Sequence, residues 1–279
     1  MALASPTLSP ALGGATRMVG SGATILAASV LADSAVEHYG GSFDRPAMSL
    51  PLAASSLALG GNALLSHSGA VARASPFTVG INAASVGVGA LGLGFHVYNV
   101  TRQTGGLSWN NLFYQAPVGA PGALLISGAL GLAAHSLKRS GSFLGSVPLA
   151  SGRVLAGFTA LGLLGTSAEA AILHFRGAYH NKAMWLPVTL PPIAAALLGR
   201  AALRGRAGLL AGPALAATAV LGLIGSAFHV YGVSRNMGGW KNWRQNLFAG
   251  PPVAAPPGFT GLAIAGLGAL RLIRRCRHA

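Results

Sequence analysis

The chain has 279 residues, of which 52% are hydrophobic and only 8% are charged. Soluble domains contain roughly 25% charged residues, so this composition excludes an ordinary soluble protein, whose surface would need many more polar side chains. The formal net charge of +15 does not indicate nucleic-acid binding, because the basic residues lie in short segments between apolar runs and form no basic helix with interleaved aromatics. We therefore expect a protein embedded in a lipid bilayer.

Eight apolar stretches follow one another along the chain, each near the ~20 residues that cross a hydrocarbon core as a helix. Helices are expected because lipid offers no partner to backbone polar groups. The first stretch could also be the apolar core of a secretory signal, but it matches the fifth stretch, in the middle of the chain, which favours a retained helix. The predicted class is an all-α integral membrane protein with about eight transmembrane helices. The stretches cover residues 18–36, 47–66, 78–98, 118–136, 154–174, 184–203, 210–231 and 252–270.

The second half of the chain repeats the first. The tripeptide His-Val-Tyr at 96–98 recurs 133 positions later at 229–231, and a second set of matches lies 136 positions apart. These matches predict two tandem four-helix repeats, each built from two helical hairpins. Because a repeat has an even number of helices, the two copies should lie parallel in the membrane. Pairs 136 positions apart are Asp33 and Glu169, His38 and His174, Met48 and Met184, and Pro51 and Pro187. The expected divisions are a cytoplasmic segment 1–17, the membrane repeats 18–139 and 153–271, and a basic cytoplasmic tail 272–279.

Lysine and arginine are unevenly distributed between the two sets of connections. The even-to-odd connections and the termini hold 12 of them, and the odd-to-even connections hold seven. Since cytoplasmic segments are enriched in Lys and Arg, both termini are expected in the cytoplasm, with the protein in the cell (inner) membrane. The 12 are Arg17, Arg73, Lys138, Arg139, Arg153, Arg200, Arg204, Arg206, Arg271, Arg274, Arg275 and Arg277, and the seven are Arg45, Arg102, Arg176, Lys182, Arg235, Lys241 and Arg244.

The two longer connections on the opposite, outer side are rich in aromatic residues. They cover residues 99–116 and 232–250. Aromatic rings prefer the headgroup level, so these side chains form either an interfacial belt or a platform on which a partner docks. The candidates in and beside these loops are Tyr98, Trp109, Tyr231 and Trp243.

Each odd-numbered stretch ends in a histidine, and parallel copies would place all four at one depth near the outer face. Histidine can ligate haem or metal and can carry protons near neutral pH, and two facing imidazoles could hold haem b. The structural alternative is that each histidine simply interacts with the negative end of its helix dipole. The four are His38, His96, His174 and His229.

Asp33 and Glu169 each lie five residues before one of these histidines, inside an otherwise apolar stretch. An ionisable group at such a depth is costly and is usually paired or functional. It could carry a proton or accept a hydrogen bond from a quinol, and the alternative is a single interhelical hydrogen bond. A spacing of five residues puts the acid and the histidine on different faces of their helix, so a direct pair within one helix is not expected.

Motifs of soluble enzymes are missing from the sequence. It has no Gly-Lys-Ser/Thr phosphate loop, no His-Glu-x-x-His motif and a single cysteine, Cys276 in the basic tail, so an enzyme that acts alone is not expected. The leading hypothesis is a membrane anchor or subunit of a redox complex. It would contact quinone or haem through the histidine layer, use Asp33 and Glu169 as proton carriers and bind a peripheral redox subunit on its outer face. Two alternatives remain open: a transporter of a small solute or ion with its site between the two repeats, and a non-catalytic scaffold.

Overall fold

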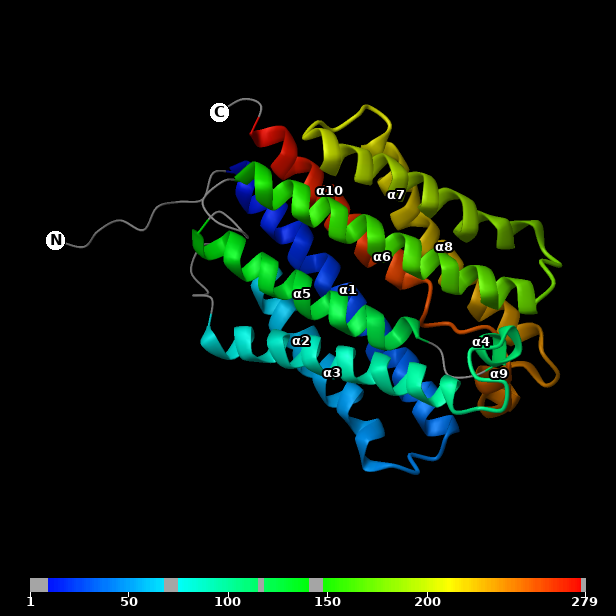
Figure 1. Ribbon diagram of the computed structural model, residues 1–279. Helices are drawn as coiled ribbons and strands as arrows, with labels where there is room; N and C mark the ends of the chain where they lie inside the picture. Colours follow the sequence, from blue (N-terminus) through cyan, green and yellow to red (C-terminus); the bar gives the residue numbers. More distant parts are fainter. Residues whose placement is uncertain (1–9, 68–74, 115–117, 141–147, 277–279) are drawn as a thin grey trace.

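We describe the protein from a computed structural model, and the description covers residues 10–67, 75–114, 118–140 and 148–276. These residues form ten α-helices and three short 3-10 helices, without a strand (Figure 1). The prediction of an all-α protein is therefore confirmed for them. The helices are α1 (Pro10–Gly40), η1 (Pro46–Ser49), α2 (Leu50–His67), α3 (Pro76–Thr101), α4 (Trp109–Tyr114), α5 (Gly119–Ser140), α6 (Pro148–Arg176), η2 (Lys182–Trp185), α7 (Leu186–Arg204), α8 (Ala211–Arg235), η3 (Gly239–Asn242), α9 (Trp243–Ala249) and α10 (Pro257–Arg275).

Seven helices are long and apolar enough to cross a membrane, and they coincide with the first seven predicted stretches. The eighth stretch forms α10, which is not among the seven and carries Arg271, Arg274 and Arg275 in its last turns. Protein surrounds this helix, because α10 packs against α1, α6 and α8. Because protein and not lipid surrounds α10, this helix can be less apolar than a helix that faces lipid. The protein is thus a multi-pass membrane protein by helix length and composition, and the eight-helix tandem repeat stays a prediction.

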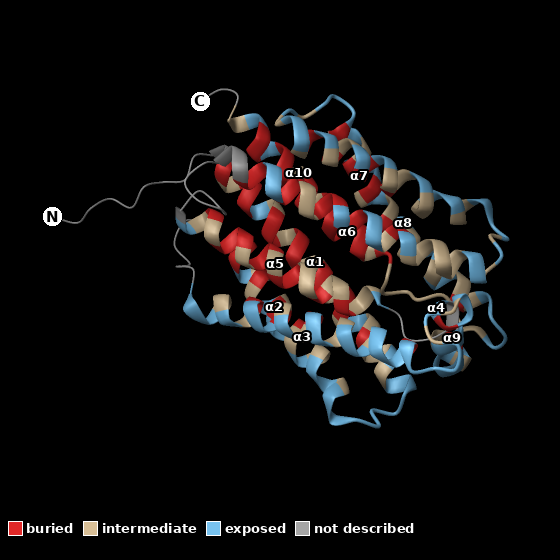
Figure 2. Ribbon diagram, in the orientation of Figure 1, coloured by how far each residue is buried: buried red, intermediate tan, exposed pale blue. Residues whose placement is uncertain are grey.

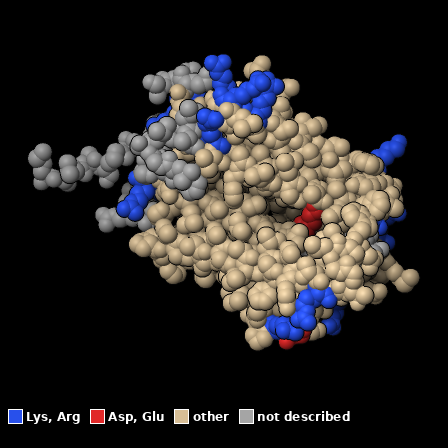
Figure 3. All heavy atoms as spheres, in the orientation of Figure 1, with Lys and Arg blue, Asp and Glu red and all other residues tan. Residues whose placement is uncertain are grey.

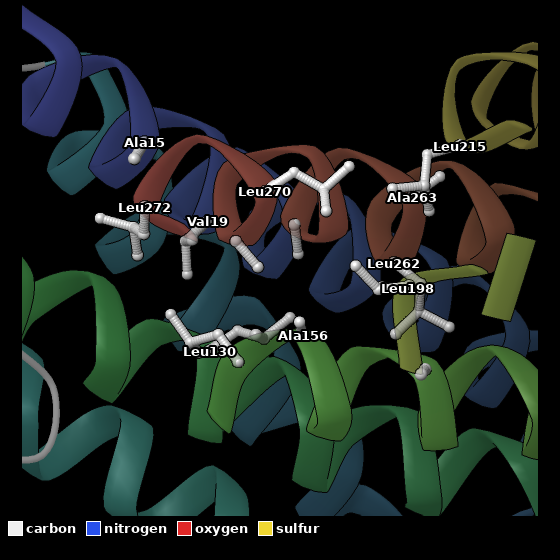
Figure 4. Close-up of a cluster of buried hydrophobic side chains, with 14 of the residues drawn as sticks. Ala15, Val19, Leu130, Ala156, Leu198, Leu215, Leu262, Ala263, Leu270 and Leu272 are labelled. Atoms are coloured by element: carbon white, nitrogen blue, oxygen red, sulfur yellow. The ribbon is translucent and has the colours of Figure 1, made fainter. Parts of the chain in front are cut away.

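Helices α1 and α10 lie side by side at the centre of the bundle (Figure 1). α1 also packs against α2 and α5, while α2 pairs with α3 and α6 pairs with α7. Buried residues concentrate on the central helices, and α2, α3, α7 and α8 are exposed along most of their length (Figure 2). The core between the central helices is formed by apolar side chains such as Val19, Leu130, Ala156 and Leu270 (Figure 4).

Glycine allows α1 and α10 to approach each other closely. A Cβ atom on Gly22 would lie 2.5 Å from the carbonyl oxygen of Gly261, and one on Gly268 would lie 3.0 Å from that of Ala15. In the other half, the positions that correspond to Gly22 and Gly261 are Phe158 on α6 and Ile126 on α5. These larger side chains cannot pack backbone to backbone, so α5 and α6 do not form an equally close pair.

The outward faces of the helices are apolar. Between two ends that carry basic side chains, the visible surface of the bundle is almost free of charge (Figure 3). Its exposed side chains include Leu64 on α2, Leu91 on α3, Leu161 on α6 and Leu223 on α8, each with more than half of its surface accessible. An uninterrupted apolar surface of this extent requires lipid as its solvent.

Corresponding connections in the two halves have the same local structure. The side chain of Asn111 donates hydrogen bonds to the carbonyl oxygens of Thr104 and Gly106, at 3.1 and 2.8 Å. The side chain of Asn246 donates to the carbonyl oxygens of Met237 and Gly239, at 3.2 and 2.8 Å. Each asparagine thus closes a turn that contains two glycines with positive φ, a conformation in which glycine is favoured,.

Candidate functional site

The two intramembrane acids lie near each other. Asp33 is on α1, Glu169 is on α6, and Asp33 is close enough to Glu37 and to Glu169 for their charges to interact. Both Asp33 and Glu169 are half-buried, and each lies within a helix that can cross a membrane. The structure therefore brings together two residues that the sequence placed 136 positions apart.

Glu169 also binds the start of α5. Its carboxylate oxygen Oε1 accepts a hydrogen bond from the backbone N–H of Gly119 at 2.9 Å. A carboxylate is stabilised at a helix N-terminus by the unpaired N–H groups and by the helix dipole. A side chain on Gly119 would overlap the Glu169 carboxylate, so this contact requires glycine at position 119. The contact links the first half of the chain to the second.

A hollow in the apolar face of the bundle contains acidic atoms (Figure 3). In Figure 3, acidic atoms lie within a depression over the end of α6 and the start of α5, surrounded by uncharged surface. The carboxyl group of Asp33 makes no hydrogen bond within the described part of the chain.

Three of the four predicted histidines bind a backbone carbonyl through Nδ1. His38 contacts the carbonyl oxygen of Met48 at 2.6 Å, and His174 contacts that of Met184 at 2.9 Å. His229 contacts the carbonyl oxygen of Pro252 at 2.6 Å. These contacts tie the end of a long helix to the segment that follows it, which explains the recurrence of histidine structurally. The fourth, His96, is half-buried near the end of α3.

Two of these histidines come together. The ring centroids of His174 on α6 and His229 on α8 are 6.4 Å apart, with an interplanar angle of 74°. Since Nδ1 of each ring contacts a carbonyl oxygen, Nε2 is the nitrogen that could meet a ligand. Among the described residues, no group of three or more His, Cys, Asp or Glu could hold a metal ion, so a metal centre of the carboxylate-rich type is not present there.

The predicted aromatic residues of the outer loops are all exposed, and the loops contain two short helices, α4 and α9, that sequence reasoning missed. Each short helix packs on a long helix of the other half. Trp109 of α4 contacts Phe175 of α6, with ring centroids 6.4 Å apart. Phe248 of α9 stacks on Tyr39 of α1, with ring centroids 5.7 Å apart. These contacts lie at the C-terminal ends of the two helices that carry Asp33 and Glu169.

A buried asparagine pair was also missed by sequence reasoning. The side chain of Asn82 on α3 donates to Oδ1 of Asn62 on α2 at 3.0 Å, and both residues are fully buried. Nδ2 of Asn62 and Oδ1 of Asn82 have no partner within the described part of the chain. At the corresponding positions of the other half stand Leu198 and Leu215. The signal available in the sequence was this replacement of two leucines by two amides.

The single cysteine, Cys276, is partly buried at the end of α10. Burial raises the pKa of Cys276, and the neighbouring Arg275 opposes this effect only in part. A raised pKa keeps the thiol protonated and a poor nucleophile near neutral pH.

The all-helical fold and its apolar exterior define a multi-pass membrane protein. No family model matches the chain, and neither a curated protein nor a solved structure matches it. Its function must therefore be argued from the arrangement of its own residues.

Proposed function

We propose that the protein carries protons or small monovalent cations across the membrane, with Asp33 and Glu169 as the binding site. The observation that carries this proposal is that the carboxyl groups of Asp33 on α1 and Glu169 on α6 are close enough for their charges to interact. Two carboxylates near each other in a medium of low dielectric constant repel strongly. Binding one proton or one monovalent cation between them relieves this repulsion, which is the property required of a carrier site.

The contact between Glu169 and Gly119 supports a coupling between loading and movement. The N–H of Gly119 interacts more strongly with an ionised carboxylate than with a neutral one. Loading of the site would therefore weaken the connection between α6 and the start of α5. Motion of one half against the other around a fixed site is a common way to alternate access, and α5 and α6 are the pair with the looser packing. The orientation expected from the basic residues puts this site nearer the outer face.

Proton flux into liposomes tests this proposal. Full-length protein is reconstituted into phosphatidylcholine liposomes that contain a pH-sensitive dye, and a potassium diffusion potential drives protons inward. The wild type should acidify the lumen faster than empty liposomes. The variants Asp33→Asn and Glu169→Gln should fall to the level of empty liposomes, because a neutral amide cannot bind and release a proton. The matched control Asp44→Asn removes an exposed acid of the loop and should behave as the wild type.

Repeating the assay with sodium in place of protons covers the cation version of the proposal, with a sodium-sensitive dye inside the liposomes. Flux of either ion that depends on both carboxyl groups supports a carrier. A wild type that resembles empty liposomes in both assays contradicts the proposal. Flux that survives in the double variant Asp33→Asn/Glu169→Gln contradicts the assignment of the site.

The contact between His174 and His229 favours a second candidate function, a membrane subunit of a redox complex. Two imidazoles with free Nε2 atoms on different helices could ligate haem or bind a quinone carbonyl. A reduced-minus-oxidised absorbance spectrum of protein purified from its native membrane tests this candidate. A haem band should disappear in His174→Ala and His229→Ala but persist in His180→Ala, where the exposed histidine contacts only its own turn. A colourless wild type removes the haem version, and a protein with neither flux nor a haem band would be a scaffold.

A further inference from the structure

The turn between α7 and α8 exposes two kinds of side chain that rarely occur together in water. Three arginines and three leucines lie between residues 200 and 210, in the last turn of α7 and the turn that follows it, and all of them are exposed. The leucines are 80%, 93% and 68% accessible, which is unusual for large apolar side chains beside exposed arginines. The six residues are Arg200, Leu203, Arg204, Arg206, Leu209 and Leu210.

No acidic side chain of the protein can neutralise these arginines. The sequence contains four acids, and all of them lie elsewhere: Asp33 and Glu37 near the end of α1, Asp44 in the following turn and Glu169 near the end of α6. The α7–α8 turn is at the opposite end of the bundle, beside the end of α10 (Figure 1). Basic side chains gather at this end in the space-filling view (Figure 3), so the counter-charge must come from outside the protein.

The turn is held firmly in place. Arg153 at the start of α6 donates hydrogen bonds to the carbonyl oxygens of Ala202 and Leu203, at 2.6 and 2.9 Å, and so binds the end of α7. Gly205 then ends α7 in the left-handed conformation, with φ of 64°. Ala207, in the middle of the turn, packs against the hydrophobic core. The exposed arginines and leucines therefore project from a fixed backbone.

A further cation lies next to this turn. A Cβ atom on Gly212, in the first turn of α8, would lie 3.7 Å from a guanidinium nitrogen of Arg274. Arg274 is exposed near the end of α10. The guanidinium groups of the turn and of α10 thus border one surface, which we define as the arginine surface: Arg200, Arg204, Arg206 and Arg274.

Two arginines at the other end of the bundle have tyrosine partners within the protein. The guanidinium groups of Arg102 and Arg235 lie 5.6 and 5.7 Å from the ring centroids of Tyr98 and Tyr231. Arg102 also donates a hydrogen bond to the hydroxyl group of Tyr98. Within the described part of the chain, Arg200, Arg204 and Arg206 have neither an aromatic nor a hydrogen-bonding partner through their side chains. They are the cations that remain to be paired.

We propose that the arginine surface binds the phosphate headgroups of anionic phospholipids, while Leu203, Leu209 and Leu210 insert into the adjoining acyl region. Arginine binds phosphate oxygens in a bidentate manner, and apolar side chains next to such cations bury themselves at the boundary of headgroups and acyl chains. A soluble phosphate could satisfy the arginines but not the leucines, so a lipid is the ligand that accounts for both. This site is independent of the carboxyl pair.

Lipid binding by the purified full-length protein tests the proposal. Native mass spectrometry in a neutral detergent measures the affinities for short-chain phosphatidylglycerol and phosphatidylcholine. Each basic residue near an anionic headgroup contributes about 1 kcal/mol, so loss of three should weaken binding roughly 100-fold. We expect the triple variant Arg200→Gln/Arg204→Gln/Arg206→Gln to lose its preference for phosphatidylglycerol and to approach its affinity for phosphatidylcholine.

A matched variant controls for total charge. Arg45→Gln/Arg102→Gln/Arg235→Gln removes three cations from the opposite end and should keep the wild-type affinity for phosphatidylglycerol. If the Gln variant at the arginine surface does not fold, the charge-conserving Arg200→Lys/Arg204→Lys/Arg206→Lys takes its place. It should retain binding that weakens as the salt concentration rises.

Three results would overturn the proposal. The first is equal binding of the two lipids by the wild type. The second comes from the arginine variants: unchanged phosphatidylglycerol binding in the Gln variant or, where the Lys variant replaces it, binding that does not depend on salt. The third is displacement of phosphatidylglycerol by inorganic phosphate at the same concentration, which would show that the arginines bind a soluble anion without help from the leucines. Replacement of Leu203, Leu209 and Leu210 by serine should weaken the binding of both lipids.

Discussion

The close contact of α1 and α10 can be tested with one methyl group. In Gly22→Ala, the new Cβ would lie 2.5 Å from the carbonyl oxygen of Gly261 and 2.9 Å from the Cβ of Ala265. Both neighbours belong to the backbone of α10 or are fixed to it, so neither can rotate away, and the helices must separate by about 1 Å to restore normal contact distances. Overpacking of this kind costs roughly 1–3 kcal/mol.

The matched control is Gly165→Ala on α6. A Cβ there would meet nothing within 4 Å, and replacing a helical glycine by alanine is favourable by roughly 0.5–1 kcal/mol. The measurement is the midpoint of thermal unfolding of each purified variant in detergent. With about 2–4 °C per kcal/mol for a chain of this size, we expect Gly22→Ala to unfold roughly 2–12 °C below the control. A Gly22→Ala protein as stable as Gly165→Ala would show that α1 and α10 are not in backbone contact.

Further predictions concern polar side chains. The double variant Asn62→Leu/Asn82→Leu should be at least as stable as the wild type, because it removes two unpaired buried atoms and copies the other half. Asn62→Leu alone removes one of the two acceptors of the Asn82 amide, which keeps only its bond to the carbonyl oxygen of Thr78, and should cost roughly 1–3 kcal/mol in thermal unfolding. Asn246→Ala deletes two hydrogen bonds that close the α8–α9 turn and should speed proteolysis of the turn at Gly238. Maleimide alkylation of Cys276 at pH 7 should be slower than that of a free thiol and should accelerate as pH rises, because burial raises its pKa,.

The long helices could be predicted because membrane spans follow from apolar length alone. The stretch 47–66 became η1 and α2, and the stretch 184–203 became η2 and α7, with bounds that differ by a few residues. Positions of the outer helices on the bundle could not be predicted, since spans that are apolar on every side give no periodic signal for the face that packs. Helix α10 can be less apolar than the other long helices because α1, α6 and α8 enclose it. This enclosure is a property of the assembled bundle, so the sequence pattern alone could not predict it.

The candidate site was predicted residue by residue but not as an arrangement. The sequence singled out Asp33 and Glu169 by their depth in apolar stretches, and it indicated no direct partner for either. Their proximity depends on how α1 and α6 cross, which the sequence pattern does not encode. For the histidines, their recurrence in the sequence indicated a shared role. The contacts of His38 and His174 with the carbonyl oxygens of Met48 and Met184 show a structural role that two of them share. A redox role for His229 and His174 stays a prediction.

The central position of α10 has a consequence for biosynthesis. Its main neighbour, α1, is synthesised long before α10, so the contact between these two central helices cannot form until residues 257–275 have left the ribosome. Until then, the glycine-rich face of α1 around Gly22 must be covered by lipid, an insertion factor or another helix. A nascent chain that stops before residue 257 would lack the helix that occupies the middle of the bundle, and quality-control proteases of the membrane should recognise and remove such a product.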